Sequence, residues 1–252
     1  GLTVDLGGNT DILNLGFTGA NTLSVMNVES IVGNAGNDTV TVVGGGVTSV
    51  NLGAGTADTL VLASGNNTVS IANVETVIGG TGVDVVTTTS ATLAVGGALD
   101  TLIGTSGNDV VTGFGVTGTI NLGAGSADVL SLSSGTNTVT ISGVESVSGG
   151  TGVDTVTMTS TALTVSGALD SLIGTASNDI VTASNLTGTV DLGGGTITIG
   201  ANVESVLGGA GVDVVNMTTA TLAVGGALDT LIGTSGNDVV TAFGVTGTIS
   251  LG

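Results

Sequence analysis

Aspartate is the residue of this chain whose spacing could support chemistry. Ten aspartates end short glycine-rich stretches such as Gly33–Asp38, Gly79–Asp84 and Gly104–Asp109. These motif aspartates recur at intervals of 19 to 34 residues and are Asp11, Asp38, Asp58, Asp84, Asp109, Asp128, Asp154, Asp179, Asp213 and Asp238. The chain has 19 acidic residues and no Lys, Arg or His. Carboxylates that come together in it therefore need a positive charge from outside the chain.

A second set of acids follows its own spacing. Seven acids stand nine residues before a motif aspartate: Glu29, Glu75, Asp100, Glu145, Asp170, Glu204 and Asp229. If repeats stack, equal positions lie about 4.8 Å apart, and two bare carboxylates at that distance repel by roughly 1 kcal/mol in water. Calcium would remove the repulsion, because it takes about six to eight carboxylate and carbonyl oxygens. We therefore predict that the ten motif aspartates bind calcium. The alternative is that Asp and Asn only shape turns with their short side chains.

The elements that must position these acids are short strands. The chain has 47 Gly, no Pro and no Cys, and apolar residues alternate in brief runs such as Leu60 with Leu62 and Leu130 with Leu132. Such runs, broken by Gly and Asn, indicate strands joined by tight turns. Repeats this short bury their apolar faces only by stacking. We predict one all-β domain over 1–252, a parallel β-solenoid of the β-helix or β-roll type, with about ten stacked coils of roughly 20–26 residues.

Three motifs carry a family resemblance. Gly79–Val86, Gly149–Val156 and Gly208–Val215 follow Gly-Gly-x-Gly-x-Asp-x-U, where U is a large apolar residue. They resemble the repeats-in-toxin (RTX) nonapeptide, and Val-Glu-Ser before the motif resembles repeats of large bacterial surface-layer, adhesin or matrix proteins. The resemblance covers essentially the whole chain and implies calcium-dependent folding after type I export. Tandem nonapeptides are absent, so calcium sites would form between coils, and the contexts of Asp11, Asp58 and Asp128 depart from the motif.

Charge and composition exclude several functions. A net charge of −19 excludes nucleic acid as a partner, because that affinity comes largely from Lys and Arg. No apolar run reaches the roughly 18 residues of a membrane span. The acids recur in every repeat and no Lys, Arg, His, Tyr or Cys accompanies them. We therefore predict no catalytic residue and no enzyme activity.

The resulting prediction is a structural extracellular protein on the bacterial cell surface. It would form a calcium-stabilised surface layer, sheath or matrix filament by self-association, end to end or laterally, with a surface polysaccharide as a further candidate partner. We expect the chain to be a slice of a longer array or a subunit that polymerises. The alternatives are the stalk of a giant calcium-dependent adhesin and an ice- or ligand-binding region. An ice-binding row would consist of Thr105, Thr175 and Thr234 with Asn108, Asn178 and Asn237.

Overall fold

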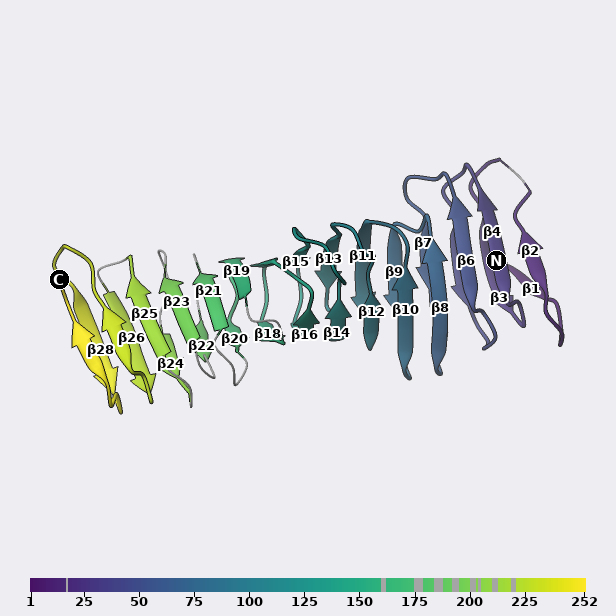
Figure 1. Cartoon of the computed structure of the whole chain (residues 1–252). Coiled ribbons are helices and arrows are strands. Elements are labelled where there is room, and N and C mark those ends of the chain that lie inside the picture. The colour runs from purple at the N-terminus through teal and green to yellow at the C-terminus, as the bar shows by residue number, and fades with distance from the viewer. Residues whose placement is uncertain are drawn as a thin grey trace. The chain divides into compact units, whose positions relative to one another are not determined.

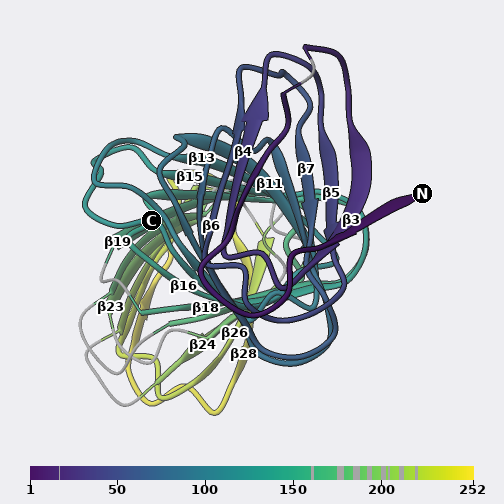
Figure 2. The same ribbon diagram turned by 90° about the vertical axis from the view of Figure 1, so that its right-hand side faces the viewer.

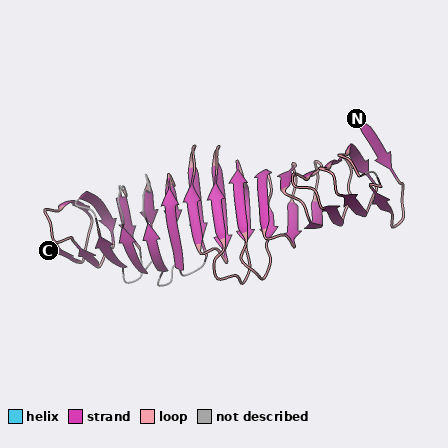
Figure 3. Ribbon diagram, turned by 90° about the horizontal axis from the view of Figure 1, so that it is seen from above, coloured by secondary structure: helices cyan, strands magenta, loops and turns pink. Residues whose placement is uncertain are grey.

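The computed structural model describes residues 1–16, 18–159, 162–174, 179–183, 188–191, 195–199, 203, 205–209, 213–218 and 221–252. Every regular element in these residues is a β-strand (Figure 3). Consequently, none of the described elements is a helix that could cross a membrane. The chain divides into two compact units, Gly1–Asp128 and Val129–Gly252.

The first unit consists of two parallel sheets whose strands alternate along the chain (Figure 1). One sheet holds, in order, β1 (Leu2–Asp5), β3 (Thr22–Met26), β5 (Thr39–Val42), β7 (Thr59–Val61), β9 (Thr76–Gly79), β11 (Thr92–Gly97) and β13 (Val110–Phe114). The other sheet holds β2 (Ile12–Asn14), β4 (Ser30–Asn34), β6 (Ser49–Gly53), β8 (Asn67–Ala72), β10 (Asp84–Thr88), β12 (Thr101–Ile103) and β14 (Thr117–Asn121).

The second unit repeats this arrangement. One sheet holds β15 (Val129–Leu132), β17 (Ser146–Gly149), β19 (Ala162–Gly167), β21 (Asp179–Ala183), β23 (Gly195–Ile199), β25 (Asp213–Met217), β27 (Thr230–Ile232) and β29 (Thr248–Ser250). The other sheet holds β16 (Asn137–Ser142), β18 (Asp154–Met158), β20 (Ser171–Ile173), β22 (Thr189–Asp191), β24 (Ser205–Gly208), β26 (Thr221–Gly226) and β28 (Val239–Phe243).

Each turn of the solenoid contains one strand from each sheet. Seen from the end of the first unit, β3, β5 and β7 lie behind one another (Figure 2). Leu2 pairs with Leu23, 21 residues on, and Asp179 pairs with Gly195, 16 residues on. The predicted parallel β-solenoid is confirmed. Its turns are shorter than the predicted coils, because each turn has only two strands.

Alternation along the strands forms the core. In β8, Asn67, Val69 and Ile71 are buried, whereas Thr68 and Ser70 face outward. Successive strands place apolar residues in register, as in the column of Leu23, Val40, Leu60, Val77 and Val95, all of which are buried. Burying each such side chain contributes about 1.5–3 kcal/mol. The stacked columns therefore stabilise a turn that could not fold alone.

Several of the corners between strands need a left-handed residue. Asn73 has φ 50° and Gly97 has φ 71°, a region that Gly and Asn enter more readily than other residues. A buried apolar residue and then an acid follow: Val74 and Glu75 after Asn73, and Leu99 and Asp100 after Gly97. The Asn-Val-Glu and Gly-Ala-Leu-Asp segments thus build the same kind of corner. Both place an acid directly before the next strand.

Candidate metal centre

The motif aspartates stand at the entry to strands and point inward. Asp38 directly precedes β5, Asp58 directly precedes β7, and Asp84 is the first residue of β10. Eight of them are at most 1% exposed: Asp38, Asp58, Asp84, Asp109, Asp128, Asp154, Asp179 and Asp213. Asp11 and Asp238 are half-buried. Carboxylates this deeply buried need hydrogen-bond donors or a cation.

At the consensus motifs, main-chain and side-chain N–H groups meet this need. Asp84 accepts the Gly80 N–H at Oδ2 (2.7 Å) and the Asn67 amide N–H of the preceding turn at Oδ1 (2.6 Å). The same two-sided arrangement holds Asp154, with Gly150 N (2.9 Å) and Asn137 Nδ2 (2.7 Å), and Asp213, with Gly209 N (2.7 Å) and Gly195 N (3.0 Å). Each carboxylate therefore fastens its own turn to the turn before it.

Threonine takes over the donor role at two other motifs. Asp109 accepts both the N–H (2.7 Å) and the hydroxyl (2.9 Å) of Thr105. Asp238 accepts the same two groups of Thr234, at 2.8 and 2.6 Å. These hydroxyls donate to their own motif instead of standing in an outward row. Thr175 and Asn178, the other members predicted for that row, lie outside the described residues.

The second set of acids belongs to the same ladders. Asp100 Oδ2 accepts the main-chain N–H of Asp84 (2.8 Å), and Glu75 Oε2 accepts that of Asp58 (2.8 Å). The corresponding bonds are Glu29 with Asp11 N (2.7 Å), Asp170 with Asp154 N (2.8 Å) and Asp229 with Asp213 N (3.0 Å). Each of these acids thus caps the motif aspartate one turn earlier in the chain. Glu204 lies outside the described residues.

Asp38 and Asp58 differ from the consensus motifs. Asp38 accepts the main-chain and amide N–H groups of Asn21 at Oδ1 (2.9 and 2.8 Å), and Asp58 accepts the Asp38 N–H at Oδ1 (2.6 Å). The other oxygen of each carboxylate, Oδ2, is buried and accepts no hydrogen bond. The Oδ2 atom of Asp11 is in the same situation. Leaving a buried polar atom unpaired costs about 1–3 kcal/mol, and more for a charged group.

Burial and neighbouring charge also shift proton affinity. Burial raises the pKa of Asp58 above its ordinary value of 3.8; the N–H of Asp38 opposes the shift, and the charges of Glu75 and Asp38 add to it. Burial likewise raises the pKa of Asp213 above 3.8, against the N–H groups of Gly209 and Gly195. Both ionised carboxylates are therefore destabilised by their surroundings.

The ten predicted ligands fit calcium unequally. Among the described residues, no three acidic side chains gather into a metal-binding group, so carbonyl oxygens would have to complete any site. At Asp84, N–H donors occupy both carboxylate oxygens, and this corner does not fit a cation. At Asp58, one buried oxygen has no donor, and this corner does fit one. That division was not visible in the sequence.

Sequence reasoning missed two donors. Asn67 and Asn137 are buried and bond Asp84 and Asp154 through their amides. Each pairs directly with the aspartate it contacts, in register across the sheet. The available signal was the 17-residue distance from Asn to Asp in both pairs, which is the length of one turn.

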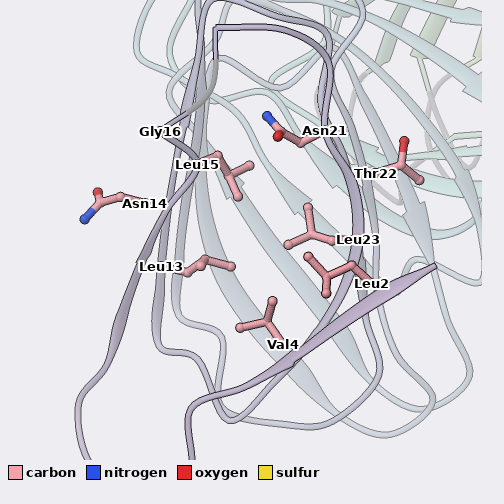
Figure 4. A pocket seen from close by; sticks show the side chains of 9 residues that line it. All are labelled: Leu2, Val4, Leu13, Asn14, Leu15, Gly16, Asn21, Thr22 and Leu23. Carbon is pink, nitrogen blue, oxygen red and sulfur yellow. The ribbon is translucent and has the colours of Figure 1, made fainter.

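A pocket of about 260 Å³ lies in the first turn of the first unit. Leu2, Val4, Leu13 and Leu23 point into it (Figure 4), and Asn14, Asn21 and Thr22 supply its polar groups. No ionisable side chain lines this pocket. It is an apolar opening in the core and offers no acid, base or nucleophile.

Comparison with known families agrees with the motif spacing. The model of the RTX calcium-binding nonapeptide repeat (4 copies) matches residues 28–45, 95–115 and 224–244. These stretches contain Asp38, Asp109 and Asp238. The chain matches no curated protein and no solved structure. Calcium is the cation that repeats of this family bind, and such repeats are typical of secreted bacterial proteins. The chain thus carries RTX calcium-binding nonapeptide repeats, wound into a parallel β-solenoid.

Proposed function

We propose that this chain is a calcium-stabilised structural segment of a bacterial extracellular protein that forms a surface layer, sheath or matrix filament. RTX repeats in a β-solenoid fit a structural or adhesin-like repeat protein. One observation carries the proposal: buried carboxylates line up in successive turns of a chain that has no Lys, Arg or His. Such a core has no internal counter-charge, so its stability depends on an external cation.

The residues divide the work of holding the turns together. Motif aspartates such as Asp84 cap main-chain and amide N–H groups of their own turn and the preceding turn. Acids such as Asp100 cap the next ladder position. Bound calcium would supply the positive charge that these oxygens lack. Together these contacts suit a load-bearing stack better than a reaction centre, and RTX repeat solenoids are typically non-catalytic.

Exposed apolar side chains support lateral self-association. Ile103, Ile173 and Ile232 end the equivalent strands β12, β20 and β27 and are 37%, 40% and 44% exposed. Exposed apolar groups favour contact with a partner surface. Their recurrence at equivalent positions would give every repeat the same lateral contact, as a layer or sheath requires.

Assembly in the presence of calcium tests the proposal. Sedimentation velocity and electron microscopy of the chain in calcium should show sheets or filaments, and excess EDTA should dissolve them. Particles that stay monomeric in calcium, while still binding it, would overturn the layer or filament role and favour an adhesin stalk. A chain that neither binds calcium nor assembles would overturn the proposal entirely.

A further inference from the structure

We propose that calcium binds at the corner before β7, between the Asp58 carboxylate and the main-chain carbonyl oxygen of Gly36, and not at the consensus aspartates. The inference rests on the proposed calcium-stabilised function and names a site for it. The consensus aspartates act instead as caps for N–H groups. The motif that departs from the nonapeptide pattern is thus the one that takes the ion.

Three oxygens surround one point at this corner. A methyl group added at Gly55 would lie 2.5 and 2.6 Å from the two carboxylate oxygens of Asp58 and 2.7 Å from the Gly36 carbonyl oxygen. Calcium–oxygen distances in proteins are about 2.3–2.6 Å. The absence of a side chain at residue 55 therefore leaves a small space bordered by oxygen from two successive turns.

Two carboxylate oxygens of this ladder await a partner. Asp38 and Asp58 are both 0% exposed, and the Oδ2 atom of each accepts no hydrogen bond. Asp38 precedes Asp58 by one turn and donates its N–H to the Oδ1 atom of Asp58, so the two acids occupy consecutive ladder positions. No cationic side chain exists in the chain to neutralise them. A divalent cation would neutralise both and supply the missing contact.

The consensus corners lack this opening. At Asp84 and Asp213, each carboxylate oxygen already accepts an N–H. An N–H that points at an oxygen repels a cation approaching the same lone pair. Calcium would have to displace these caps and unfasten the turns that they join.

The Asp58 corner also recurs in the first unit. Gly53–Leu60 reads Gly-Ala-Gly-Thr-Ala-Asp-Thr-Leu, and Gly123–Leu130 reads Gly-Ala-Gly-Ser-Ala-Asp-Val-Leu. A methyl group at Gly125 would likewise face the Asp128 carboxylate and the Gly107 carbonyl oxygen. The arrangement is therefore a property of this octapeptide.

Calcium titration of two variants tests the site. Asp58→Asn keeps an acceptor for the Asp38 N–H but removes the charge, and Gly55→Ala fills the space and leaves every acid in place. Isothermal titration with calcium chloride should show one fewer bound ion per chain for each variant, and most of the calcium-induced rise in Tm should vanish. The matched controls are Asp84→Asn and Gly45→Ala, since a methyl at Gly45 meets nothing within 4 Å. Both controls should keep the wild-type calcium stoichiometry.

The outcomes separate this site from the broader function. If wild type binds calcium and both test variants bind the same number of ions with unchanged affinity, the Asp58 site is wrong and the calcium-stabilised function stands. If Asp84→Asn loses an ion and Asp58→Asn does not, the consensus aspartates are the ligands. If wild type itself binds no calcium, the proposed function fails together with the site. Should Asp58→Asn not fold, Gly55→Ala alone decides.

Discussion

Aspartate serves two purposes in this chain, and its neighbours decide which. At Asp84, donors from Gly80 and Asn67 occupy both carboxylate oxygens, so the side chain is a cap. At Asp58, the only donor is the Asp38 N–H, and the second oxygen is left buried without a partner. A motif search sees the same residue type in both places. The difference lies in whether Gly or Asn in the adjoining turns brings an N–H within reach.

The capping role of Asp84 predicts a loss of stability that is independent of metal. Asp84→Asn replaces one acceptor oxygen by an amide and breaks one of two buried bonds. The free energy of unfolding should fall by about 1–3 kcal/mol, equally in calcium and in EDTA. Urea unfolding followed by far-UV circular dichroism measures it, since the chain has no Trp or Tyr for fluorescence. A loss seen only in calcium would instead make Asp84 a metal ligand.

The raised pKa of Asp213 predicts how stability depends on pH in EDTA. Burial raises the pKa in the folded state above 3.8, so the folded chain holds this proton more tightly than the unfolded chain. Stability should therefore rise as the pH falls through the raised folded pKa towards 3.8. Urea midpoints measured between pH 7 and pH 4 test this, and Asp213→Asn should flatten the slope. A steeper slope in the variant would contradict the assignment.

Corners, not strands, carry the sequence signal at the level of elements. Asn73-Val74-Glu75 and Gly97-Ala98-Leu99-Asp100 look unrelated as motifs, yet each pairs a left-handed residue with a buried apolar side chain and a capping acid. Their strands could be predicted from alternation alone. That the two corners are equivalent could not, because it depends on φ and on which N–H the acid reaches.

The left-handed corner at Gly97 predicts a position-specific cost. Gly97 has φ +71°, and an added methyl would lie 2.6 Å from the Gly79 carbonyl oxygen. Gly97→Ala should lower the free energy of unfolding by more than about 1 kcal/mol, because strain adds to the close approach. Gly107→Ala is the control, since the nearest atom there is 3.6 Å away. Equal urea midpoints for the two variants would contradict the corner geometry.

Turn length shows where sequence reasoning fell short. Motif aspartates were taken to mark whole coils, but Asp58 precedes β7 in one sheet and Asp84 begins β10 in the other. The nine residues from Glu75 to Asp84 span half a turn, and Glu75 caps Asp58, one turn before it. Composition and alternation were enough to predict a stacked parallel solenoid. Assigning each acid to a ladder required the register between strands.

At the level of the whole molecule, charge decides the account. The chain carries 19 acids and no Lys, Arg or His, and eight motif aspartates are buried. Hydrogen bonds from N–H groups satisfy many of these oxygens, but they bring no formal charge. A cation that binds only the folded chain would add about 2.7 kcal/mol of stability when present at a hundredfold excess over its Kd.

Thermal unfolding in calcium and in excess EDTA, followed by far-UV circular dichroism, tests this dependence most directly. The account predicts a β-sheet spectrum in calcium and a Tm that rises with calcium concentration and drops when EDTA is added. Magnesium at the same concentration should raise the Tm less, because it demands a stricter octahedral geometry than these corners offer. Identical melting curves in calcium and EDTA would contradict the account and leave a solenoid held by N–H caps alone.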